Sequence, residues 1–141
     1  MSAEIPPAPN AVRQVYESYP SPLRERLLAL RDLVLVTAAE TPGVGRIEEA
    51  LRWGEPSFLT SETRSGTTVR IAPLRDATSE YGVFVNCQTA LIGTFRQLYP
   101  DLFRFDGSRG LLFDADDEVP TDALAHCLAL ALRYHADKRD A

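Results

Sequence analysis

Two arginines are the residues of this chain best suited to hold a negatively charged ligand. Arg96 and Arg109 carry planar guanidinium groups, which bind carboxylate and phosphate oxygens through paired hydrogen bonds. If the fold brings them near Asn86 and Trp53, these side chains would line one pocket for a small anion. The thiol of Cys87, next to Asn86, would lie in the same pocket. The sequence therefore predicts ligand binding at these residues.

The same residues have a structural alternative. The two arginines could pair with acidic side chains and tie the layers of the fold together. Trp53 could equally be a core residue, because burying an indole removes a large apolar area from water. Both interpretations stay open at the level of the sequence. The acidic candidates for such pairs are Glu48, Glu49, Glu55 and Asp101.

Nucleophilic catalysis has weaker support. Cys87 could meet His126 or His135 in the fold and form a Cys–His pair. However, Cys87 ends an apolar strand face and Cys127 lies in a helix rich in alanine and leucine, where cysteine behaves as a small buried hydrophobe. No serine stands in a Gly-x-Ser-x-Gly motif. We therefore assign no catalytic residue and expect neither hydrolase nor protease chemistry.

An acidic loop offers the candidate metal site. Its carboxylates could hold a hard cation loosely, but the EF-hand pattern would need glycine and glutamate where Val119 and Ala125 stand. The loop also has a structural interpretation, because negative charge is favourable near the N-terminus of the helix predicted to follow it. The candidate ligands are Asp114, Asp116, Asp117 and Glu118.

Composition and missing motifs narrow the classes of partner. The stretch PGVGR lacks the third glycine of a dinucleotide-binding loop and follows a predicted helix instead of a strand. A net charge of −5 with one lysine argues against nucleic-acid binding. No apolar run approaches the roughly 20 residues of a membrane span. The first ten residues lack the features of a signal peptide. We expect a cytoplasmic protein without nucleic-acid or membrane partners.

Helical periodicity predicts the elements that surround these residues. The clearest helix starts with Ser21 as its N-cap and Pro22 in its first turn, and it ends at Pro42. A later helix has Leu98 on its apolar side and contains Gly93, which suggests close approach of another element. The predicted helices cover residues 11–19, 21–41, 89–100 and 122–135.

Alternating apolar residues predict the strands. Residues 57–60, 68–73 and 81–87 show period-2 patterns, and residues 102–115 read as a hairpin. The stretch WGEP before them predicts a corner between a helix and a strand. Residues 47–53 would form a brief helical turn, Gly54 would take a left-handed conformation, and the following proline would favour an extended chain.

Together these elements predict an α+β fold, a two-layer α/β sandwich. Short strands joined by turns favour a mainly antiparallel sheet of about five strands, packed against helices. The expected organisation is a flexible arm at residues 1–10, one domain at residues 11–136 and a C-terminal tail at residues 137–141.

Four stretches in the same order resemble the YdhG-like family, domain of unknown function 1801. The similarity spans about residues 20–136. It implies a compact α/β sandwich of the YdhG-like kind. Some members of the family are described as frataxin-like iron chaperones, which implies iron held weakly by carboxylates. The stretches are TPGVGRIEEALRWGEPSF, YGVFVNCQTALIGTFRQLYP, GSRGLLFDADDEVP and ALALRYH.

The resulting expectation is a non-enzymatic cytoplasmic YdhG-like protein that binds a small ligand or, weakly, iron. One alternative is a small-anion-binding module or enzyme with a pocket around Trp53, Cys87, Arg96 and Arg109. Another is a protein that forms homodimers or larger homo-oligomers through an exposed helix or sheet face.

Overall fold

The computed structural model describes residues 5–75 and 78–140. The first four residues of the predicted arm and the last residue of the predicted tail lie outside this range, as do Asp76 and Ala77. Five helices and one open sheet of six antiparallel strands make up the described chain, which confirms the α+β fold. The sixth strand comes from a segment that was predicted to be helical.

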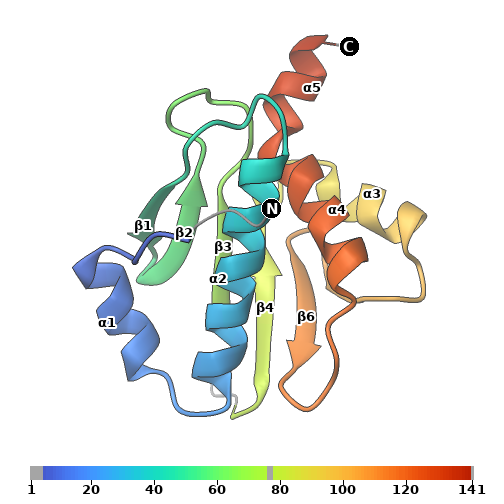
Figure 1. Ribbon diagram of the computed structural model, residues 1–141. Helices are drawn as coiled ribbons and strands as arrows, with labels where there is room; N and C mark the ends of the chain where they lie inside the picture. The colour runs from blue at the N-terminus through green and yellow to red at the C-terminus, as the bar shows by residue number, and fades with distance from the viewer. Residues whose placement is uncertain (1–4, 76–77, 141) are drawn as a thin grey trace.

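The helices form one layer. In Figure 1, α2 lies in front of β3 and β4 and runs roughly along them, α1 lies near β1 and β2, and α4 lies beside α2. The short α3 packs against α4, and α5 continues the chain beyond α4 toward the C-terminus. The bounds are α1 Asn10–Ser18, α2 Leu23–Glu40, α3 Leu91–Leu98, α4 Thr121–Leu132 and α5 Tyr134–Asp140.

The sheet has the strand order β1-β2-β3-β4-β6-β5, and every neighbouring pair is antiparallel. The edge strands are therefore β1 and β5. The register places Arg70 opposite Phe84 and Phe84 opposite Gly110. The bounds are β1 Glu48–Arg52, β2 Glu55–Leu59, β3 Val69–Pro73, β4 Glu80–Phe84, β5 Arg104–Asp106 and β6 Gly110–Asp114.

The hydrophobic core lies between the sheet and the helices. Val69 and Ile71 of β3 and Val83 of β4 are buried there against Leu27 and Val34 of α2. Because side chains alternate across a strand, Arg70 and Phe84 must lie on the opposite face of the sheet. That face carries the candidate site described below.

The segment around the only tryptophan corrects the predicted corner. Residues 47–53 are not a helical turn, because Glu48–Arg52 form a strand that pairs with Glu55–Leu59 in a tight hairpin. Trp53 and Gly54 are the two turn residues, with φ angles of 57° and 74°. Positive φ at both positions is typical of a type I′ turn, whose twist suits a two-residue hairpin.

Tertiary contacts explain why this segment is extended despite good helix formers. Strand pairing satisfies its backbone groups, and Leu51 packs against the core. The side chain of Glu49 binds Arg31 of α2 in an ion pair with N–O distances of 2.7 and 2.9 Å. These long-range contacts outweigh the small differences in intrinsic helix propensity.

Other predicted details also differ. Ser21 does not cap α2; its hydroxyl donates a hydrogen bond to Glu25, and the helix begins at Leu23. The final predicted helix is interrupted at Arg133, which separates α4 from α5. Leu98 is 45% exposed instead of lying on a buried side.

The N-terminal segment contacts the domain near the same ion pair. The carbonyl of Pro6 accepts a hydrogen bond from Arg31. Part of the segment predicted as an arm is thus held against α2. At the other end of the chain, α5 covers residues that the sequence assigned to a tail.

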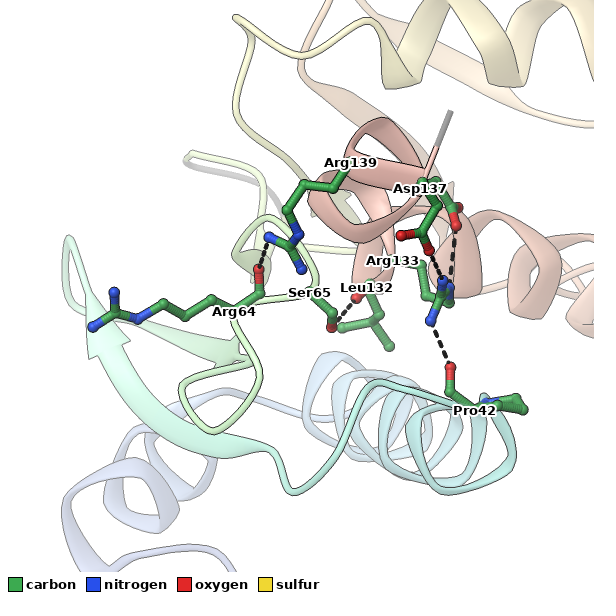
Figure 2. A network of polar contacts seen from close by, with 8 residues as sticks. Pro42, Arg64, Ser65, Leu132, Arg133, Asp137 and Arg139 are labelled. Carbon is green, nitrogen blue, oxygen red and sulfur yellow. Dashed lines mark hydrogen bonds and ion pairs between the residues drawn. The ribbon is translucent and has the colours of Figure 1, made fainter.

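The long loop between β2 and β3 is fixed to the junction of α4 and α5, as Figure 2 shows. The hydroxyl of Ser65 donates a hydrogen bond to the carbonyl of Leu132 at 2.7 Å. The backbone carbonyl of Ser65 accepts one from the amide of Ala136 at 2.9 Å. Arg133 donates to the carbonyl of Pro42 at 2.8 Å and pairs with Asp137 at 3.1 Å. The C-terminal helices are thereby tied to the β2–β3 loop and to the segment that follows α2.

Candidate functional site

A groove of about 440 Å³ lies on the sheet face opposite the core. Four of the five residues predicted to bind a ligand line it: Trp53, Asn86, Cys87 and Arg109. They come from the β1–β2 turn and from the segments that follow β4 and precede β6. The full lining consists of Arg52, Trp53, Thr67, Thr68, Arg70, Val85, Asn86, Cys87 and Arg109.

The ring of Phe84 forms a platform next to this groove. It is 7% exposed, although it lies on the face that the helices leave uncovered. A methyl group on Gly82 would lie 2.8 Å from the ring, and one on Gly110 would lie 2.7 Å from it. The two glycines therefore let the ring rest directly on the sheet, since any larger residue would displace it.

Two arginines of the groove lie over this platform. The guanidinium carbons of Arg70 and Arg109 are 5.6 and 5.9 Å from the centroid of the Phe84 ring. These distances are within the range of cation–π attraction. Phe84 thus helps to hold both positive charges beside the groove.

Ion pairs fix the arginines further. Arg70 pairs with Glu55 of the neighbouring strand, and Arg109 pairs with Asp106 at 3.3 Å. Arg52 donates a hydrogen bond to the carbonyl of Leu51 and has no carboxylate partner among the described residues. No acidic residue of the described chain belongs to the groove lining. Glu55 and Asp106 balance the charges of Arg70 and Arg109, so the net positive charge of the groove comes from Arg52.

One interpretation of the sequence made Trp53 a core residue, and the structure contradicts it. Trp53 is 89% exposed. The reason is the hairpin: the indole belongs to a turn that projects beyond the strand pairs, where no helix covers it. Burial therefore contributes little to the presence of a tryptophan at this position.

Asn86 and Cys87 lie just after β4, separated from it by Val85. The side-chain oxygen of Asn86 accepts a hydrogen bond from the amide of Gln88 at 2.9 Å, and its carbonyl accepts one from the amide of Thr89. These bonds fix the turn that leads to α3. Cys87 is exposed, so it is not the small buried hydrophobe that the sequence favoured, whereas Cys127 is buried as expected.

The Cys–His pair that the sequence left open, but did not favour, does not form within the described part of the chain. The ring of His126 shares a hydrogen bond of 2.6 Å with the hydroxyl of Tyr99, between α4 and the end of α3. His135 lies near the β2–β3 loop, where it lines a different hollow with Arg64 and Thr68. Neither histidine hydrogen-bonds Cys87.

Arg96 lies outside the groove. Its guanidinium donates a hydrogen bond to the carbonyl of Gly107 at 2.8 Å and lies 4.7 Å from the centroid of Phe105. It links α3 to the β5–β6 hairpin, which corrects the expectation that it shares a pocket with Trp53. Arg96 thus ties two parts of the fold together, as the structural interpretation of the sequence proposed. Its partners, however, are a carbonyl and an aromatic ring instead of carboxylates.

Arg52 and Arg70 also line the groove, although the sequence did not identify them as candidates. A signal for Arg70 was present, because it alternates with the buried residues Val69 and Ile71 and so must face away from the core. The pairing of β3 with β4, which places Arg70 opposite Phe84, is not readable from local patterns. Arg52 gave no usable signal while its segment was interpreted as a helix.

In the acidic loop, the first carboxylate accepts hydrogen bonds from neighbouring groups of the protein. Asp114 accepts hydrogen bonds from the amide of Asp116 at 3.0 Å and from the hydroxyl of Ser79 at 3.1 Å. Asp116, Asp117 and Glu118 are exposed. In residues 5–75 and 78–140, no three or more His, Cys, Asp or Glu side chains gather to hold a metal ion. Weak iron binding by this loop stays a prediction.

Comparisons of the chain with protein-family models, curated proteins and solved structures gave no match. The resemblance to the YdhG-like family, and the iron-related role that it implies, therefore stay predictions. Within the described ranges, none of the helices combines the length and the apolar character that crossing a membrane requires.

Proposed function

We propose that the groove binds a small anionic ligand. The observation that carries this proposal is the convergence of Arg52, Arg70 and Arg109 on one concave surface. Guanidinium groups bind carboxylates and phosphates with two parallel hydrogen bonds, and a concave site shields such bonds from water. An anion bound there would balance the charge of Arg52 and could accept hydrogen bonds from all three guanidinium groups.

The arginines would contribute differently. Arg70 has a side chain only 23% exposed and is fixed by Glu55 and by the Phe84 ring, so it is a preorganised donor. Arg109 is 61% exposed, and its pair with Asp106 spans only three residues. Exposed pairs of this kind contribute about 0–1 kcal/mol, so an anion can compete with Asp106 for this guanidinium.

Polar groups around the arginines add specificity. The hydroxyl groups of Thr67 and Thr68 and the amide of Asn86 line the same groove and can donate hydrogen bonds to anionic oxygens. A volume of about 440 Å³ suits a small molecule. The proposed function is binding, and we assign no reaction to the site.

Isothermal titration calorimetry with inorganic phosphate at low ionic strength tests this function. Wild-type protein should release or absorb heat with saturation, and R70Q and R109Q should each weaken binding by about tenfold, because each loses charge-assisted hydrogen bonds. R96Q is the matched control, since Arg96 is an exposed arginine outside the groove. Absence of saturable heat, or equal losses in R96Q and R70Q, would reject the proposal.

A further inference from the structure

We infer that the ligand of the groove is a small aromatic acid, in which a flat ring stacks on Trp53 while an anionic group binds the arginines. This inference rests on the proposed function and adds the chemical class of the ligand. Its starting point is the unusual position of Trp53, which combines a positive φ of 57° with 89% exposure.

The backbone of the hairpin disfavours tryptophan. Type I′ turns strongly prefer asparagine and glycine, because a bulky side chain with positive φ crowds its own backbone. Gly54 obeys this preference at the second turn position, and Trp53 violates it at the first. Core packing does not compensate, because the indole is almost fully exposed. Strained residues of this kind are found where a side chain must meet a ligand.

The position of the indole fits such a role. Trp53 is part of the groove lining, together with the three arginines and Asn86. Phe84 cannot serve as the stacking surface, because it is 7% exposed and two guanidinium groups lie over its ring. Trp53 is therefore the accessible aromatic face of this site.

The combination of groups defines the ligand. An exposed indole face attracts flat rings, and nearby guanidinium groups attract a phosphate or carboxylate. Both features within one groove of about 440 Å³ suit a single molecule that carries both groups. Aryl phosphates, aryl carboxylates and nucleoside monophosphates share this chemistry.

Fluorescence of Trp53 provides the test, because the chain contains no other tryptophan. Phenyl phosphate and ethyl phosphate carry the same anionic group and differ in the ring, so their dissociation constants isolate stacking. We expect phenyl phosphate to bind at least about tenfold tighter and to quench the indole emission. Adenosine monophosphate and benzoate, compared with phenyl phosphate, distinguish nucleotide and carboxylate ligands within the same class.

Two variants distinguish the effect of the Trp53 ring on ligand binding from its effect on stability. W53N supplies the residue that the turn prefers, so its melting temperature should rise by about 2–4 °C while the preference for phenyl phosphate over ethyl phosphate, measured by calorimetry, disappears. W53F keeps a ring and should retain part of that preference. A raised melting temperature also shows that W53N is folded.

The outcomes separate this inference from the proposed function. If the wild type binds both phosphates equally well, or W53N keeps the preference for phenyl phosphate, the aromatic-acid inference is wrong although anion binding stands. If neither phosphate binds, the proposed function fails with it. If Trp53 emission changes only with protein concentration, the indole contacts a second copy of the chain, and the inference is again overturned.

Discussion

Arg31 of α2 and Glu49 of β1 form a buried ion pair that joins the helical layer to the edge of the sheet. Their side chains are 8% and 6% exposed, and two hydrogen bonds of 2.7 and 2.9 Å connect them. Hydrogen bonding to Glu49 raises the pKa of Arg31. Because β1 also forms one arm of the hairpin that carries Trp53, this pair helps to orient one wall of the groove.

Removing one partner of this pair should be costly. E49L or R31M leaves a buried charged group without its partner, and we expect each to lower the free energy of unfolding by about 3–5 kcal/mol. The double variant R31M/E49L removes both charges and should lose much less than the sum of the single variants. Urea unfolding of the four proteins measures the coupling. Strictly additive losses would show that the two side chains do not interact.

Gly66 should be intolerant of any side chain. A methyl group there would lie 2.4 Å from the backbone carbonyl carbon and oxygen of Leu132, at the end of α4. G66A must therefore push the β2–β3 loop away from α4, at a cost of about 1–3 kcal/mol or more. G93A is the matched control. Contrary to the expectation from the sequence, no other element approaches Gly93, so its methyl group would enter open space in α3 and should stabilise the protein by about 0.5–1 kcal/mol. Equal effects of both variants in thermal unfolding would contradict this packing.

The two thiols should differ in reactivity. Cys127 is 1% exposed, and burial raises the pKa of its thiol to about 12. Cys87 is exposed and lines the groove. A disulfide reagent such as Ellman's should therefore modify one thiol per native chain and both after unfolding in urea. C87S should abolish the native reaction. Rapid modification of both thiols in the native protein would show that the core around Cys127 is open.

Stability should fall at alkaline pH. Burial raises the pKa of Tyr16, Tyr81 and Cys127 above their ordinary values, to about 12 for Cys127. Since the folded state keeps these protons longer than the unfolded chain, their contribution is complete below pH about 9 and is lost as pH rises toward 12. Each group contributes a slope of at most about 1.4 kcal/mol per pH unit.

Urea midpoints measured at increasing pH under reducing conditions follow this loss. C127A should show a shallower decline between pH about 9 and 12, because it lacks the thiol whose ionisation the fold opposes. A midpoint that stays constant across this range would mean that these groups are solvated in the native protein.

Local patterns in the sequence were sufficient for the fold class. Helical periodicity located α2 and α4, and alternation of apolar residues located β3, β4 and the β5–β6 hairpin. The failure at β1 has a physical cause. The segment EEALR consists largely of good helix formers, and only strand pairing and the ion pair of Glu49 with Arg31 make it extended.

Only part of the candidate site could be predicted from the sequence. Trp53, Asn86, Cys87 and Arg109 were expected to lie close together, and all four line one groove. Arg96 was misplaced because α3 directs it toward the β5–β6 hairpin. Trp53 is exposed because it lies in a type I′ turn. A sequence pattern that indicates a helix for this segment gives no sign of such a turn. The position of Arg70 in the groove depends on the pairing of β3 with β4, which local sequence patterns do not reveal.

Amide NMR spectra recorded during a titration with inorganic phosphate test the central claim most directly, because they locate the bound anion without assuming its affinity. We predict that the largest chemical-shift changes fall on Thr68, Arg70 and Asn86 and on the indole N–H of Trp53, all in the groove. Shifts concentrated at the acidic loop or on the helical layer, or no shifts at saturating phosphate, would contradict an anion site on this face of the sheet.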